Sequence, residues 1–299
     1  MKKSVSLLLA ALMLTGALAG CGSSASTSGT QAADGADSGV SGAITVISRE
    51  DGSGTRGAFI ELTGVEEKTA DGKKVDNTTA DAEIANKTDV VLTSVAGNEK
   101  GIGYISLGAL NDTVKAVKVD GAEATVDNVK AGAYKLSRSF NIATKGEPTG
   151  LAKDFINFIL SKEGQAVVTD NKYIAVNDAA ESFVSDGTSG QIAVGGSSSV
   201  SPVMEKLIEA YKSVNPNASI DLQTSDSTSG MTGAMDGTFA IGMASRELKD
   251  EEAAQLTGTA IALDGIAVVV NPANTIDELS MDQIKSIYVG DITDWGDLA

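Results

Sequence analysis

The sequence predicts an α/β protein with largely parallel sheets, and three observations support this prediction. Short β-branched runs alternate with amphipathic helical stretches along most of the chain, which is typical of parallel sheets covered by helices. The chain has 299 residues, of which 42 % are hydrophobic, enough for one large or two medium domains with buried cores. Gly/Ser-rich loops join several predicted strands to the helices that follow them.

The first 20 residues have the pattern of a signal peptide. Lys2 and Lys3 precede an apolar run over residues 6–19 that is too short for a comfortable membrane span. The run ends in Leu-Ala-Gly before Cys21, the only cysteine, and this resembles a bacterial lipobox. We therefore expect cleavage after residue 20 and a lipid such as palmitate on Cys21. An ordinary secretory signal with a chance cysteine, or a core thiol, is the alternative.

A flexible tether is expected over residues 21–42. These residues include 11 Gly or Ser and no Lys, Arg or aromatic residue. Such a composition buries too little apolar area to offset the entropy of ordering. Folded structure is therefore expected to begin near Ala43.

The predicted elements then follow in order. Phe59 and Leu62 share one side of a helix after the first Gly/Ser loop, Leu151, Phe155 and Ile159 share a stripe of another, and Ser201-Pro202 is a typical helix start. Residues 121–130 are expected to form a surface turn region. Strands are predicted at 43–48, 101–107, 113–119, 138–144, 192–194, 240–244 and 261–271, and helices at 151–159, 201–214, 231–236 and 281–288.

Missing residue types exclude several kinds of site. Without His and with one Cys, the chain cannot form a Ser-His-Asp or Cys-His catalytic group, a His-ligated metal site or an intramolecular disulfide. The formal charge of −17, from 23 basic and 40 acidic residues, disfavours binding to nucleic acid. We expect no cofactor and no metal ion.

Three Gly/Ser/Thr loops that each precede a helix predict a site for a small anion. They cover residues 49–55, 195–202 and 225–231. Helix N-termini present unpaired N–H groups and a positive dipole end, while Ser and Thr hydroxyls add donors. Any one such loop is more often capping or turn chemistry. Together with Arg49, which offers planar bidentate hydrogen bonds, the three loops favour a tetrahedral oxyanion.

The residues of these loops resemble a known family. The segment SREDGSGTR at 48–56 is similar to the signature loop of the phosphate-binding lipoprotein of the bacterial phosphate ABC transporter. The segments GSSSVSP at 196–202, DSTSG at 226–230 and IGMASR at 241–246 resemble other phosphate-contacting segments of that family. The similarity extends over nearly all of the expected mature chain.

The resemblance implies a set of binding residues. It assigns phosphate contacts to Arg49, Ser53, Gly54, Thr55, Ser199, Val200, Ser227 and Ser245, and it gives Asp51 the role of orienting Arg49. Where some family members place an Asp that accepts a proton from hydrogen phosphate, this chain has Ser245 followed by Arg246. A serine hydroxyl can still accept a hydrogen bond from hydrogen phosphate, but it repels fully deprotonated sulfate less strongly than an Asp carboxylate does.

The resemblance also implies the fold, the location and the partners. It implies a two-lobed clamp like the periplasmic binding proteins, with a mainly parallel sheet and flanking helices in each lobe and two interlobe crossovers. The chain would be a monomeric extracytoplasmic receptor without enzymatic activity. It would be anchored in the cell membrane by lipid and would deliver inorganic phosphate to ABC transporter permease subunits.

The order of the segments differs from the family. The loop around Ser199 comes first in family members and the loop around Arg49 near the middle, whereas here the order is reversed. The chain therefore resembles a circular permutation, with one lobe from 43–136 plus 264–299 and the other from 137–263. A fragment of a longer protein, or a half that pairs with another chain, is the alternative.

Other functions stay open at this point. The same loops would suit another tetrahedral oxyanion, or a phosphate sensor or surface protein. A phosphoester hydrolase would need Ser53 or Ser199 as nucleophile, yet no evident base accompanies either serine in the sequence.

Overall fold

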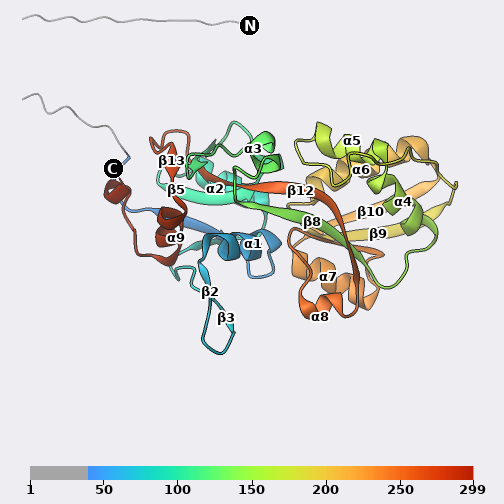
Figure 1. Ribbon diagram of the computed structural model, residues 1–299, viewed down its shortest axis with the longest axis horizontal. Coiled ribbons are helices and arrows are strands. Elements are labelled where there is room, and N and C mark those ends of the chain that lie inside the picture. The colour runs from blue at the N-terminus through green and yellow to red at the C-terminus, as the bar shows by residue number, and fades with distance from the viewer. Residues whose placement is uncertain (1–39, 299) are drawn as a thin grey trace, which may run out of the picture. The chain divides into compact units, whose positions relative to one another are not determined.

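The computed structural model describes residues 40–298 (Figure 1). The predicted signal peptide over 1–20, the predicted lipid anchor Cys21 and nearly all of the predicted tether over 21–42 lie outside the described residues.

The α/β class predicted from the sequence is confirmed. The strands are β1 (Thr45–Arg49), β2 (Glu66–Lys68), β3 (Lys74–Asp76), β4 (Glu83–Ala85), β5 (Gly101–Ser106), β6 (Lys115–Ala116), β7 (Lys118–Val119), β8 (Ser137–Thr144), β9 (Gly190–Ser197), β10 (Ala218–Ser225), β11 (Ile241–Ala244), β12 (Thr257–Val270) and β13 (Glu278–Leu279). The α-helices are α1 (Gly54–Thr63), α2 (Thr88–Ala96), α3 (Val126–Lys130), α4 (Gly150–Leu160), α5 (Lys162–Asp170), α6 (Ser201–Val214), α7 (Ser227–Asp236), α8 (Asp250–Ala253) and α9 (Met281–Val289). Short 3₁₀ turns are η1 (Leu107–Ala109) and η2 (Trp295–Leu298).

One sheet runs through most of the described residues. Its strand order is β10-β9-β11-β8-β12-β5-β1-β4, with β6 also paired to β12. The strands toward both ends pair in parallel: β10 with β9, β9 with β11, β5 with β1, and β1 with β4. The long central strands β8 and β12 are antiparallel to each other and connect two groups of helices (Figure 1).

Two large hydrophobic clusters lie along this sheet. The first, core A, includes Phe59 of α1, Tyr104 of β5 and Trp295, whereas the second, core B, includes Phe155 of α4 and Tyr211 of α6. Strand β12 contributes Ile261 and Ala262 to core B and residues 266–270 to core A. The change from one core to the other therefore falls near Asp264, in the middle of the connecting strand.

Several elements differ from the sequence prediction. Helix α2, strand β10, helix α5 and the β2–β3 hairpin were not predicted, and α3 forms within the expected surface turn region 121–130. Helix α2 is rich in Val and Thr, which have modest helix propensity, and its N-cap Lys87 makes no side-chain cap. Burial of Val91 and Val95 in core A stabilises the helix instead.

The two ends of the described chain lie side by side. Ala43 forms an antiparallel bridge with Asp294, and the Ile44 amide donates to the Thr293 carbonyl at 2.8 Å. The Trp295 amide donates to the Gly42 carbonyl at 3.1 Å, and the Trp295 side chain is fully buried in core A. Both ends are therefore anchored in the same part of the fold.

Residues 40–298 include no helix that is both long enough and apolar enough to cross a bilayer.

Candidate functional site

Four helix N-termini meet where core A and core B face each other. Helices α1 and α2 begin at Gly54 and Thr88 and pack in core A, and α6 begins at Ser201 and packs in core B. Helix α7 begins at Ser227 and packs in a third, smaller cluster with Ala143 and Ala244. The sequence predicted three of these helix starts and missed α2. Their first-turn N–H groups and dipoles favour a bound anion.

Buried hydroxyl groups fill the space between these helix starts. We call this group the hydroxyl cage, and every member is at most 7 % exposed. The cage consists of Thr55, Thr88, Ser197, Ser198, Ser199, Ser227 and Ser245.

The cage hydroxyls contact one another across the two sides. Thr55 Oγ1 lies 2.8 Å from Ser199 Oγ and 3.3 Å from Ser245 Oγ. Thr88 Oγ1 lies 3.3 Å from Ser199 Oγ. Ser227 Oγ accepts from the Ser245 amide at 3.1 Å. Because a hydroxyl can both donate and accept, these groups can reorient toward the oxygens of an oxyanion.

Arg49 supplies a buried positive charge to the cage. It is the last residue of β1, only 2 % exposed, and its Nη2 donates to Ser198 Oγ at 3.1 Å. Its backbone amide donates to Tyr104 OH at 3.1 Å, and its Nε donates to the Ala85 carbonyl at 3.2 Å. The position of the guanidinium is therefore set by both backbone and side-chain contacts.

Glu50, rather than Asp51, orients Arg49, which corrects the sequence expectation. Glu50 accepts from Nε and Nη2 of Arg49, both at 2.8 Å, in a bidentate pair. The Asp51 side chain is 97 % exposed and pairs with Arg56 at 3.1 Å. Residues 51 and 52 form the turn that follows β1, and there the Asp51 side chain is exposed to solvent.

The remaining predicted residues have different local roles. Ser53 is the N-cap of α1 and its hydroxyl accepts from the Arg56 amide. Gly54 lies so close to the cage that a Cβ atom there would be 2.4 Å from Ser227 Oγ. The Val200 side chain is in core B, and its amide donates to the Ser197 carbonyl at 3.0 Å in a turn. Among the predicted residues, Arg49, Gly54, Thr55, Ser199, Ser227 and Ser245 are thus brought together at the cage.

Sequence reasoning missed several residues of the site. Ser197 and Ser198 lie in a predicted loop but were not singled out, and Thr88 starts a helix that was not predicted. Arg138 was placed only in a predicted strand, yet it is 7 % exposed and its Nη2 donates to Thr55 Oγ1 at 3.3 Å. Its partner Asp264, also buried, forms an ion pair with Nη1 of Arg138. The sequence did contain a signal for this pair: Arg138 and Asp264 are oppositely charged residues, and each lies in an otherwise apolar, β-rich run.

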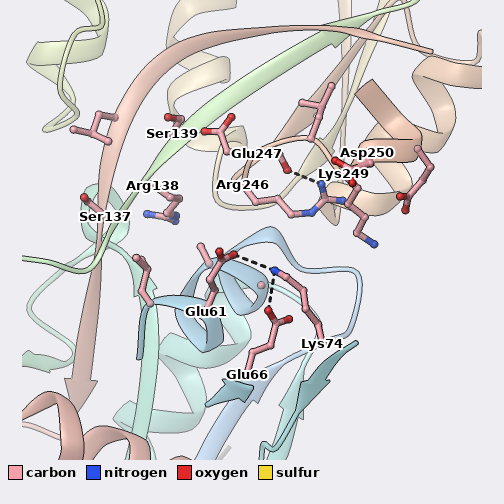
Figure 2. Close-up of a pocket in the computed structure, with 16 residues that line it drawn as sticks. Glu61, Glu66, Lys74, Ser137, Arg138, Ser139, Arg246, Glu247, Lys249 and Asp250 are labelled. Atoms are coloured by element: carbon pink, nitrogen blue, oxygen red, sulfur yellow. Dashed lines mark hydrogen bonds and ion pairs between the residues drawn. The ribbon is translucent and has the colours of Figure 1, made fainter. Parts of the chain in front are cut away.

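A cleft of about 750 Å³ lies beside the cage, with α1 on one side and the segment that precedes α8 on the other (Figure 2). Arg138 and Arg246 both line it. Arg246 forms a bidentate pair with the Glu252 carboxylate, at 2.7 and 2.8 Å. Lys74 pairs with Glu66 at 2.8 Å on the opposite wall. The cleft walls are therefore charged, with most charges paired.

Residues 40–298 contain no group of three or more His, Cys, Asp or Glu side chains that could hold a metal ion. The arrangement instead suits an anion, held by hydroxyls, helix N-termini and guanidinium groups.

Comparison with known proteins agrees with the resemblance seen in the sequence. The chain matches the PBP superfamily domain over residues 25–163 and 182–299. It is 49 % identical over 300 residues to the phosphate-binding protein PstS 2 of Streptococcus agalactiae serotype V, covering 99 % of this chain and 98 % of the relative. It is 48 % identical over 296 residues to PstS 2 of Streptococcus pneumoniae serotype 4, covering 99 % of each.

A solved structure shows the same similarity. The crystal structure of a phosphate-binding protein of a phosphate ABC transporter from Streptococcus pneumoniae TIGR4 is 50 % identical, with a TM-score of 0.69 over 86 % of this chain and 100 % of that chain. The family match, the 49 % identity over nearly the whole chain and the similar solved structure all agree. The chain therefore belongs to the PBP superfamily, within the family of the phosphate-binding proteins PstS.

Proposed function

We propose that this protein is an extracytoplasmic receptor that captures inorganic phosphate and delivers it to the permease subunits of an ABC transporter. The observation that carries the proposal is the buried guanidinium of Arg49 beside the hydroxyl cage, where four helices begin. The names of the PstS relatives and of the similar crystal structure support the same ligand and transporter.

The cage suits a tetrahedral oxyanion through local contacts. The full chain carries 23 basic against 40 acidic residues, so long-range attraction does not favour capture of an anion. Neutral hydroxyls and helix N-termini can bind the oxygens without that attraction, and Arg49 adds a charge-assisted pair of donors. Selectivity then depends on which oxygens of the ligand carry protons, because hydroxyls accept as well as donate.

We further propose that binding involves no chemistry. Ser199, a candidate nucleophile in the hydrolase hypothesis, shares its hydroxyl contacts with Thr55 and Thr88. Ser53, the other candidate, caps α1. Among residues 40–298 neither serine hydroxyl is hydrogen-bonded to a lysine or a carboxylate that could act as a base.

The remaining parts of the proposal concern location and assembly. The sequence pattern before Cys21 supports a lipid anchor at the outer face of the cell membrane. The two cores joined by β8 and β12 support a clamp whose lobes close over the ligand as a monomer.

Calorimetric titration with phosphate, sulfate, arsenate and molybdate at two pH values tests the proposal. We expect phosphate to bind, and Arg49→Ala to weaken binding by about 2 to 5 kcal/mol because a buried charged donor is lost. Lys74→Ala is the matched control, since Lys74 lies on the cleft wall and is paired with Glu66. Unchanged phosphate affinity in Arg49→Ala would contradict the role of Arg49, and absence of phosphate binding to the unaltered protein would contradict the function.

A further inference from the structure

A second buried arginine lies at the boundary between the two cores. Arg138 in β8 and Asp264 in β12 are register partners on the two long connecting strands. Their side chains are 5 % and 0 % exposed and form an ion pair. Nη1 of Arg138 also donates to the Gly265 carbonyl at 2.8 Å, so contacts with β12 fix the Nη1 end of the guanidinium.

A chain of hydroxyls connects Arg138 to Arg49. Arg138 Nη2 contacts Thr55 Oγ1 at 3.3 Å, and Thr55 Oγ1 contacts Ser199 Oγ at 2.8 Å. Ser199 Oγ lies 3.3 Å from Thr88 Oγ1, which accepts from Arg49 Nη1 at 3.5 Å. Both guanidinium groups therefore contact the hydroxyl cage, one through Thr55 and the other through Thr88 and Ser198.

Two further observations place Arg138 in a site that favours an anion. Within residues 40–298 its buried Nε has no hydrogen-bond partner, although an unpaired buried donor is costly. Burial lowers the pKa of Arg138 although the Asp264 carboxylate raises it, and the positive charge of Arg49 makes a smaller contribution that lowers it, so the two guanidinium charges interact. A dianion between them would relieve that repulsion.

We propose that Arg138 is a second phosphate-binding arginine, which contacts the bound oxyanion from the side of the connecting strands. The inference rests on the proposed function, because the ligand class is the same tetrahedral oxyanion. Two guanidinium groups match a ligand with several oxygens better than one, since each offers paired donors in a plane. Figure 2 shows Arg138 on the strand that borders the cleft, above α1 and separate from Arg246. Asp264 holds Arg138 in position and balances its charge.

The test compares Arg138→Lys and the double variant Arg138→Gln/Asp264→Asn with the unaltered protein. The double variant removes both charges together, so it leaves no unpaired buried ion and does not change the net charge. A loss of affinity in it therefore reports direct contact rather than a change in the overall field. Lys74→Ala is again the control, because Lys74 lines the same cleft and is paired with Glu66.

Titration of each protein with inorganic phosphate gives the dissociation constant, and thermal unfolding without phosphate gives the stability. We expect phosphate to bind about ten- to a hundredfold more weakly to both Arg138 variants and about equally well to Lys74→Ala. If the double variant folds and binds phosphate within about threefold of the unaltered protein, Arg138 is a structural residue only and the inference is wrong. If the unaltered protein does not bind phosphate, the proposed function fails instead.

Discussion

Gly54 shows how a single residue controls the approach of the two sides of the site. It is the first residue of α1, and a Cβ there would lie 2.4 Å from Ser227 Oγ and 2.8 Å from Ser245 Oγ. Real Cβ atoms essentially never approach other heavy atoms below 3.0 Å, so with a larger residue either these two cage hydroxyls must move or the two sides must separate. The family loop thus has a steric reason for glycine at this position.

We therefore predict that Gly54→Ala weakens phosphate binding by about tenfold or more, because overpacking at the junction opposes closure over the ligand. The free energy of unfolding should change less, since the two sides can separate to relieve the contact. Gly57→Ala in the same helix is the control: its Cβ would lie 3.8 Å from Arg246 Cδ, an ordinary contact. Isothermal titration calorimetry of both variants checks the prediction, which equal affinities would contradict.

At the scale of elements, the four helix starts at the cage differ in how they are capped. Ser53 caps α1 and Asp226 caps α7 through their side chains. Helices α2 and α6 have Lys87 and Val200 as N-caps, and neither makes a side-chain cap. The first amides of α2 therefore remain more available to a ligand, and so do those of Ser201 and Val203 in α6, where Pro202 has no N–H.

The segment that leads into α8 borders the cleft and is held by one ion pair. Arg246 and Glu252 are 11 % and 4 % exposed at their side chains. Burial alone would raise the pKa of Glu252, but hydrogen bonds from Arg246 and from the Lys249 amide outweigh it, and the pKa is lowered. A lowered pKa in the folded state means that the ionised form stabilises the fold.

This stabilisation should be present above the unfolded pKa of Glu, about 4.3, and should be lost as the pH falls through the lower folded value. We predict that Glu252→Gln lowers the free energy of unfolding by about 1 to 3 kcal/mol at pH 7, because Arg246 loses a charged partner. The difference between the two proteins should shrink as the pH falls below about 4. Urea unfolding at several pH values measures the free energy of unfolding of both proteins. If the difference between them stays constant with pH, the Arg246–Glu252 pair is not its cause.

At the scale of the whole molecule, the two ends of the described chain are adjacent, as the predicted circular permutation requires, and the PstS 2 relatives that match 99 % of this chain share its segment order. The bridge between Ala43 and Asp294 places the first strand beside the last turn. The family match is interrupted between residues 163 and 182, where we expect the usual family ends to lie. Residues 176–179 in this interval are exposed and belong to no helix or strand.

We predict that the segment order expected for other members of the family can be built from this chain without loss of function. A variant that joins residue 298 to residue 42 through a flexible linker of about ten residues, with new ends between Asp178 and Ala179, should fold and bind phosphate within about threefold of the unaltered protein. The new ends would fall in exposed chain, and the linker would connect segments that are already hydrogen-bonded. Circular dichroism and phosphate titration check this; an unfolded or non-binding product would show that the present order is required.

Local pattern alone determined the α/β class, the strongly periodic helices and the three Gly/Ser/Thr loops that meet at the cage. Helix α4 and helix α6 have apolar stripes that repeat at helical spacing, and the Gly/Ser loops precede helices because their residues cap and turn. The same pattern indicated Arg49, whereas Thr55, Ser199, Ser227 and Ser245 were named only from the family resemblance.

Only the tertiary structure decided which charged side chains lie at the cage. Helix α2 forms because its valines are buried in core A, so Thr88 enters the cage without a local signal. Glu50 rather than Asp51 pairs with Arg49, because the turn after β1 exposes Asp51. Arg138 and Asp264 are 126 residues apart and meet only through the register of β8 and β12. Contacts between distant segments depend on strand pairing and burial, and these are properties of the folded chain rather than of any local stretch.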